Sequence, residues 1–292
     1  MSTLREANPV TAFVWIMTTA GIAMFSFNPA IQIISLIGAL SYFLVRNPDT
    51  RLSSHLPWLG LGLLSAVLNP FFSHNGATVL FVVNHNPITL EAFIYGGVLG
   101  LALLTVIYWF KSFQQIMTTD KLLYVFGSAL PKMTLLLSIA LRYIPLLKKQ
   151  TAKIRDSQKA LGLFKEENLI DRLRGEMRIF SVLVSWALEN GIITADSMSA
   201  RGYGIGRRTR FALFRFRKFD IIMCVCCLIL AGVCIGTIAT GTLDFTFYPN
   251  IAVHEPVTLS GIAYAAYAVL ALFPCILELE EIFRWKSLKS RI

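Results

Sequence analysis

The sequence contains few charged residues for its length. Asp, Glu, Lys and Arg make up only 15% of its 292 residues, whereas 55% are hydrophobic and the mean hydropathy is +0.62. A soluble domain usually carries about 25% charged residues. The apolar residues also form long unbroken runs, so we expect an all-α integral membrane protein rather than a soluble domain.

A disulfide framework and a conventional metal motif are also missing. Four of the five cysteines fall in one apolar run and the fifth in another, where cysteine acts as a small hydrophobic residue. The Cys-x-Cys-Cys pattern lacks a second ligand pair at a usable spacing. We therefore expect no metal and no cofactor at these residues: Cys224, Cys226, Cys227, Cys234 and Cys275.

Sequence signatures of several catalytic sites are absent as well. The chain has no Walker pattern and no His-Glu-x-x-His, and the glycines at 202, 204 and 206 follow a predicted helix without a Gly-Lys-Ser/Thr ending. Two loops, 73–87 and 242–256, hold polar residues that leave a loop site open as an alternative: His74, His85, His254, Asp244 and Glu255. On balance the sequence predicts a protein that is not an enzyme and does not itself hydrolyse ATP.

Six apolar stretches are long enough, or almost long enough, to cross a bilayer. They lie at about 9–27, 29–45, 56–72, 88–110, 219–241 and 257–277. The first follows Arg5 and Glu6 and has no small-residue cleavage pattern, so we expect a retained span rather than a signal peptide.

The distribution of basic residues predicts the orientation. Loops 73–87 and 242–256 have no Lys or Arg, whereas Arg46, Arg51 and Lys111 flank the other ends of the spans. The positive-inside rule then places both termini in the cytoplasm. The same rule accounts for the formal net charge of +10 without a nucleic-acid partner, and the basic run 207–218 is predicted to lie against anionic lipid.

Residues 122–147 do not fit this scheme. They are apolar enough to span, but both flanks are basic, and Gly127 and Pro131 interrupt them. We expect a broken, re-entrant or interfacial segment there. The predicted organisation is therefore a four-span region at 1–121, the broken segment at 122–147, a cytoplasmic block at 148–218, and a two-span hairpin with a basic tail at 219–292.

The block 148–218 is predicted to contain two amphipathic helices. In the second, an apolar stripe recurs at spacings of three or four: Leu173, Met177, Phe180, Val184, Ala187, Gly191, Ala195 and Met198. The first covers 148–163 and is more basic, with one face made of Leu147, Thr151, Ile154, Gln158 and Leu161. Such helices can be plain core helices, or can offer one face to a partner.

Both predicted helices end in a similar triplet. These are Ala160-Leu161-Gly162 and Ala200-Arg201-Gly202. Glycine after a helix is common because it accepts the left-handed conformation without a Cβ clash, and a cation in the last turn interacts favourably with the helix dipole. Those general preferences explain each end separately, but they do not explain why both lie in one block of a membrane protein.

At this point the sequence resembles a known family, the transmembrane T component of energy-coupling factor (ECF) transporters. The resemblance is strongest in ALENGIITADSMSARGYGIGRRTRF at 187–211, and weaker stretches add to it: Asn69-Pro70 with FFSHNGATVLF at 71–81, ITLEAFIYG at 88–96, LPKMTLLLSIALRYIPLL at 130–147, and 160–162.

The resemblance implies a non-catalytic coupling subunit. In that family, two cytoplasmic coupling helices each end in an Ala-Arg-Gly-like triplet whose arginine docks on one of two ATPase subunits, and a separate membrane S component binds a vitamin, metal ion or similar micronutrient. Carried over, Arg201 with Ala200 and Gly202 matches the second triplet. Leu161 replaces the arginine of the first, between Ala160 and Gly162. Lys159 and Lys165 are the nearby cations that could replace its charge.

A secondary transporter that acts without ATPases is the main alternative. Proteins of that kind place ionisable residues near the bilayer midplane. Here Glu91 and Asp220 lie at the ends of predicted spans, and no Asp, Glu or His lies in the middle of one. This pattern favours the coupling subunit.

Overall fold

The computed structural model describes most of the chain in two compact units. The described residues are 4, 7–48, 50–73, 76–83, 86–127, 130–162, 169–206, 214, 216–243, 245–248, 252–253 and 257–289. Unit 1 comprises Met1–Val125 and Phe214–Ile292, and unit 2 comprises Phe126–Leu213. Each unit is described separately.

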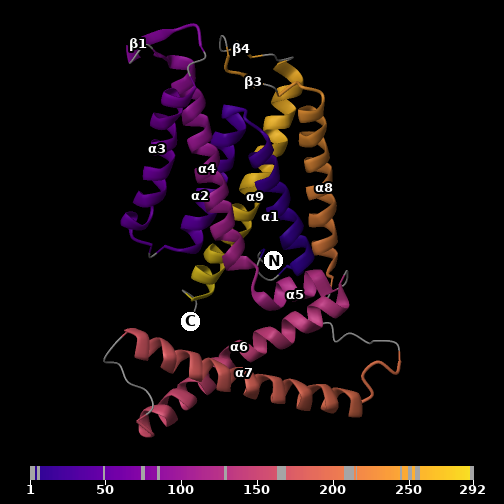
Figure 1. The fold of residues 1–292 in the computed structure, drawn as a ribbon. Coiled ribbons are helices and arrows are strands. Elements are labelled where there is room, and N and C mark those ends of the chain that lie inside the picture. The colour runs from indigo at the N-terminus through magenta and orange to yellow at the C-terminus, as the bar shows by residue number, and fades with distance from the viewer. Residues whose placement is uncertain are drawn as a thin grey trace. The chain divides into compact units, whose positions relative to one another are not determined.

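Unit 1 is a bundle of apolar helices with two short β-hairpins at one end (Figure 1). Its helices are α1 (Pro9–Phe25), α2 (Pro29–Arg46), η1 (Leu52–Ser54), α3 (Leu56–Phe72), α4 (Leu90–Ile116), α8 (Lys218–Ala239) and α9 (Val257–Lys289), and most of α5 (Thr119–Gly127). The hairpins are antiparallel pairs, β1 (Val79–Val83) with β2 (Asn86–Thr89) and β3 (Phe245–Thr246) with β4 (Ala252–Val253). Both chain ends lie at the end of this bundle away from the hairpins.

The starts of the first two helices follow from a repeated Asn-Pro pair. The side chains of Asn8 and Asn28 each accept a hydrogen bond from a backbone N–H two residues later, at 3.0 Å. Proline follows as the first helical residue, where its missing N–H costs no intrahelical bond. The Asn28-Pro29 pair thus ends the connection from α1 and begins α2.

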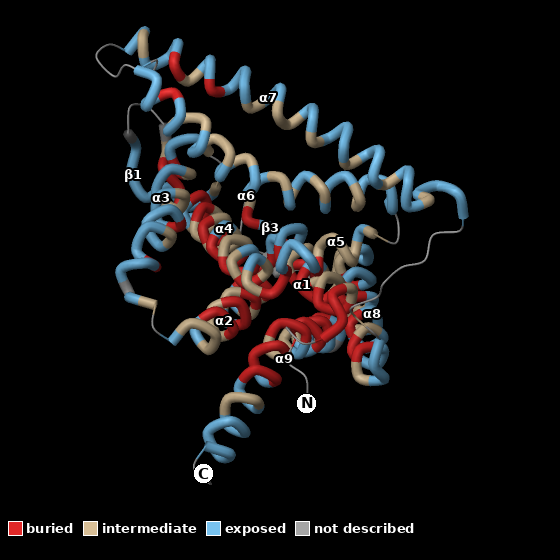
Figure 2. The backbone as a smooth tube through the Cα atoms, turned by 90° about the horizontal axis from the view of Figure 1, so that it is seen from below, coloured by how far each residue is buried: buried red, intermediate tan, exposed pale blue. Residues whose placement is uncertain are grey.

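The centre of unit 1 is buried among α1, α2, α4 and α9 (Figure 2). Tyr267 of α9 is fully buried, and its hydroxyl donates to Ser35 Oγ of α2 at 2.6 Å. Trp109 of α4 donates to the same oxygen at 3.0 Å, and Trp15 of α1 donates to the carbonyl of Leu270 at 3.0 Å. Polar groups buried in this way need partners, so this network fixes how the four helices pack.

Helix α3 is mostly exposed and packs on α4. A Cβ atom on Gly100 would come within 2.4 Å of the Gly62 carbonyl oxygen, so glycine is required there for the backbones to approach this closely. The amide of Asn69 donates to the carbonyl of Ala92 at 2.7 Å, and Lys111 Nζ lies 4.5 Å from the centroid of the Trp58 ring.

The expected all-α membrane fold is confirmed, and the structure adjusts several boundaries. Within the described residues, five helices are long and apolar enough to cross a membrane: α2, α4, α7 (Leu169–Ala200), α8 and α9. The apolar helices α1 and α3 have 17 residues each. Helix α9 continues past the predicted end at 277 to Lys289, because charged residues end an apolar run without ending a helix. The hairpins were not predicted; β3 and β4 have only two residues each, too few to show the alternation of a strand.

In unit 2, the interruption expected within 122–147 lies between α5 and α6 (Pro131–Ala160). The boundary expected at 147 is absent, however, because the helix predicted over 148–163 is the second half of α6. Pro145 lies inside α6 without ending it. A proline removes one helical hydrogen bond, and a long helix with many other bonds tolerates this locally.

Candidate functional site

Helices α6 and α7 form an antiparallel, crossing pair in unit 2 (Figure 1). Near the middle of α6, the hydroxyl of Tyr143 lies 3.2 Å from the Asn190 carbonyl oxygen and 2.9 Å from Thr194 Oγ1. Farther along, Arg155 Nη2 lies 2.8 Å from a carboxylate oxygen of Glu176. The contact that comes first along α6, at Tyr143, comes second along α7, at Thr194. The two helices therefore run antiparallel.

The face of α6 predicted from Leu147 to Leu161 includes a buried residue, whereas most of the predicted stripe of α7 is exposed. On α6, Gln158 is buried and lies on the face predicted from Leu147 to Leu161. On α7, Gly175 and Ile179 are buried, whereas Leu173, Met177 and Phe180 of the predicted stripe are exposed. The stripe therefore remains as an apolar surface of unit 2.

The end of α7 is a Schellman motif. The N–H of Gly202 donates to the Ser199 carbonyl and the N–H of Tyr203 donates to the Met198 carbonyl, both at 3.0 Å. Gly202 has φ +79°, the left-handed conformation that this motif needs. The backbone turn leaves Arg201 as the cap residue between the helix and the left-handed glycine.

The described part of the α6 end has the same cap and left-handed glycine. The N–H of Gly162 donates to the Lys159 carbonyl at 3.0 Å, and Gly162 has φ +67°. Leu161 takes the cap position that Arg201 takes in α7, and each cap N–H bonds the carbonyl four residues earlier, Ser157 and Ser197 respectively. Lys159 lies in the last turn of α6, whereas Lys165 lies outside the described residues.

Both cap side chains are open to a partner. Leu161 is 72% exposed, and Arg201 is exposed and makes no side-chain hydrogen bond or ion pair within the part of the chain that the structure describes. Figure 1 shows the two helix ends on opposite sides of the crossing. The part of α6 from Tyr143 to Leu161 is about 27 Å long, and the part of α7 from Thr194 to Arg201 extends about 10 Å in the opposite direction, so the two caps are separated by a distance on the order of 40 Å.

Two apolar residues beside Arg201 were not singled out from the sequence. Ile205 is 86% exposed and Tyr203 is 47% exposed, and both lie in the turn after Gly202. Their position could have indicated a contact surface, because both are apolar side chains between glycines directly after a helix. Exposed apolar side chains are common where a protein contacts a partner.

The other candidate sites gain no support from the described residues. The loop residues His74, His85, His254, Asp244 and Glu255 all lie outside that part of the chain. Within it, no group of three or more His, Cys, Asp or Glu residues could hold a metal ion. The five cysteines are free thiols on α8 and α9, two helices of the bundle.

Residues 1–211, which include both triplets, match the CbiQ family model, described as "Cobalt transport protein". The chain belongs to this family. One relative is the energy-coupling factor transporter transmembrane protein EcfT 1 of Listeria monocytogenes, 30% identical over 194 residues that make up 61% of this chain and 72% of the relative. The matched family range ends before α8 and α9.

Two further relatives have the same kind of name. EcfT of Listeria innocua is 32% identical over 190 residues, 60% of this chain and 71% of the relative. EcfT of Streptococcus equi subsp. equi is 27% identical over 187 residues, 60% of this chain and 69% of the relative. The resemblance to ECF T components is thereby confirmed, and the chain is a multi-pass membrane component of that transporter family.

Proposed function

We propose that this CbiQ-family protein couples two ABC-type ATPase subunits to a membrane S component that binds the transported micronutrient. The observation that favours this function is the matched pair of helix ends, 160–162 and 200–202. They share one backbone geometry, expose their cap side chains and lie on opposite sides of a crossing helix pair. A pair of rigid helices can pass the movement of two partners to a third.

At the end of α7, Arg201 would dock on one ATPase. Its guanidinium offers five N–H donors in a rigid fork, suited to a carboxylate or to a row of carbonyl oxygens. Tyr203 and Ile205 would add apolar contact beside it. At the end of α6, Leu161 provides no charge, so the second ATPase contact would be apolar and weaker.

The exposed stripe of α7 would contact a partner other than the ATPases. Leu173, Met177 and Phe180 form apolar surface well away from Arg201 along the helix. An S component is a membrane protein with apolar surface of its own, so this stripe is the proposed contact for it. We further propose that 148–218 and both chain termini are cytoplasmic, because the basic residues of the connections favour that side.

Replacement of Arg201 tests the ATPase contact. Arg201→Ala in the assembled transporter should lower the amount of ATPase that co-purifies by about tenfold, since a charge-assisted hydrogen bond contributes roughly 1.5–3 kcal/mol. Arg201→Glu should lower it further. Transport into vesicles should fall in parallel, while membrane insertion stays normal.

Arg174→Ala is the matched control. Arg174 is also an exposed arginine of α7, and its ion pair with Asp171, at 3.9 Å, is solvated and worth little. Normal assembly and transport in the Arg201 variants would refute the docking role. Transport by the purified chain alone, with no ATPase present, would instead support a secondary transporter.

A further inference from the structure

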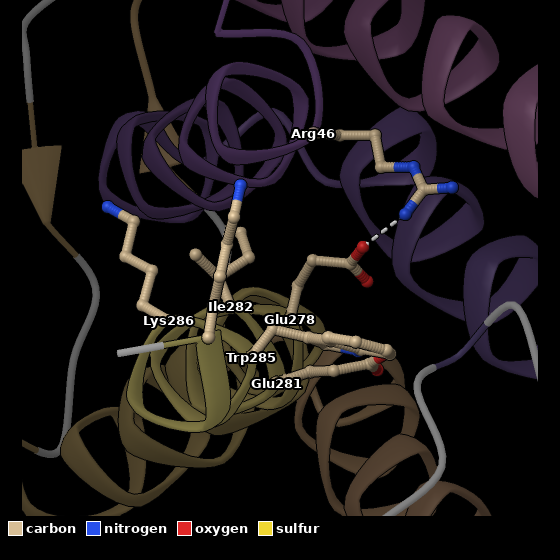
Figure 3. Close-up of a pocket in the computed structure, with 7 residues that line it drawn as sticks. Arg46, Glu278, Glu281, Ile282, Trp285 and Lys286 are labelled. Carbon is tan, nitrogen blue, oxygen red and sulfur yellow. Dashed lines mark hydrogen bonds and ion pairs between the residues drawn. The ribbon is translucent and has the colours of Figure 1, made fainter. Parts of the chain in front are cut away.

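A pocket of about 340 Å³ lies in unit 1 where the C-terminal ends of α2 and α9 meet (Figure 3). It is lined by Arg46 from α2 and by six residues of α9: Glu278, Glu281, Ile282, Trp285, Lys286 and Lys289. The pocket is separate from both triplets, and the proposed coupling role does not use it.

The inner part of this pocket has more negative than positive charge. Arg46 forms an ion pair with Glu278, which is only 4% exposed. The other carboxylate oxygen of Glu278 is buried and has no hydrogen-bond partner among the described residues, and neither does Oε2 of Glu281. One guanidinium and two carboxylates therefore line this part of the pocket. A buried carboxylate oxygen without a partner is costly, so a cation with N–H donors would satisfy both glutamates.

The outer part of the pocket has the opposite charge. Lys286 and Lys289 lie farther along α9, and Figure 3 shows Lys286 on the opposite side of the pocket from Arg46. Trp285 and Ile282 supply apolar surface between the two charged parts. The complementary ligand has a cation at one end, an anion next to it and an apolar portion.

The position along α9 places this pocket at the depth of lipid headgroups. The apolar part of α9, residues 257–277, is about 31 Å long, close to the thickness of the hydrocarbon core of a bilayer. Glu278 follows it directly, and Arg46 is the last residue of α2. Tryptophan is enriched at this interface, as at Trp285.

We propose that this pocket binds the headgroup of a phospholipid with a primary amine, such as phosphatidylethanolamine. Its ammonium group donates to Glu281 and to the free oxygen of Glu278. Phosphatidylcholine has no N–H donor for the two carboxylates. Phosphatidylglycerol has no cation, and the inner carboxylates repel its phosphate.

Lipid titration of the purified full chain in detergent tests this assignment. Phosphatidylethanolamine should raise the midpoint of thermal unfolding and bind in native mass spectra, while phosphatidylcholine and phosphatidylglycerol should bind about tenfold more weakly. Glu281→Gln should weaken phosphatidylethanolamine binding about tenfold, because it removes one charge-assisted hydrogen bond. Glu280→Gln is the matched control, since Glu280 is exposed and does not line the pocket.

Three results would overturn the proposal. They are equal binding of the three lipids, unchanged binding by Glu281→Gln, and preferential phosphatidylglycerol binding that depends on Lys286 and Lys289 alone. Water-soluble phosphoethanolamine serves as a competitor with the wild-type chain, so the assignment can be tested even if a variant fails to fold. Weak competition is expected if the acyl chains contribute, whereas complete competition at equal concentration would indicate a soluble ligand instead.

Discussion

At the scale of single residues, the two cap positions differ in chemistry but not in backbone. Leu161 and Arg201 each bond the carboxyl-terminal turn of their helix and each precede a left-handed glycine. Within the described residues from each cap to its glycine, the side chain at the cap is what distinguishes the two ends. An exposed leucine offers no directional bond, whereas the arginine offers a fork of donors.

We predict that Leu161 contributes less to assembly than Arg201. Leu161→Ala should lower ATPase co-purification by no more than about threefold and should change stability by about 0.5 kcal/mol or less, because the side chain is 72% exposed. Leu161→Arg should keep the complex intact. Loss of the complex on Leu161→Arg would instead reveal an apolar docking surface that excludes charge.

The residue types at both ends could be predicted from the sequence, but their surroundings could not. The triplets, and the glycines that follow each cap, are visible as local patterns. The exposure of Ile205 and the pairing of Tyr143 with Thr194 are not, because they depend on where the chain goes after the turn and on how two helices cross.

At the scale of elements, the positive-φ glycine after α7 defines where the helix ends. We predict that Gly202→Ala destabilises the last turn by about 1 kcal/mol, since a side chain disfavours the left-handed conformation seen at φ +79°. Hydrogen exchange of the amides around 197–203 should become about fivefold faster.

Gly191→Ala is the opposing control on the same helix. Gly191 lies inside α7, and a Cβ atom there would meet nothing within 4 Å. Alanine favours a helix over glycine by up to about 1 kcal/mol, so exchange in α7 should slow. Faster exchange in both variants, or no change in Gly202→Ala, would contradict the role given to the left-handed turn.

Helix periodicity predicted the elements more accurately than it predicted their faces. The six apolar stretches all became helices. The sequence left open whether the stripe from Leu173 to Met198 packs in a core or faces a partner. In the structure Leu173, Met177 and Phe180 are exposed, whereas Ile179 is buried. A helix that is apolar on much of its circumference does not reveal from its sequence which side a partner will cover.

At the scale of the whole molecule, length and composition leave α7 ambiguous. It is long and apolar enough to span a bilayer, but only 6% of its most apolar window is buried. Its polar groups argue against a span: Glu176 pairs with Arg155, and Asn190 and Thr194 lie beside Tyr143. Charged groups are costly in a hydrocarbon core. We therefore predict that both ends of α7 lie on one side of the membrane.

Single cysteines at Arg172 and Ser199, both exposed near opposite ends of α7, test this prediction in a chain whose five cysteines are replaced by alanine. A membrane-impermeant thiol reagent should label both positions from the cytoplasmic side only. Ala77→Cys, exposed at the hairpin end of unit 1, is the reference and should be labelled from the opposite side. Labelling of positions 172 and 199 from different sides would make α7 a span. It would then remove the basis for placing both triplets on the ATPase side, because the end of α6 and the end of α7 would face different compartments.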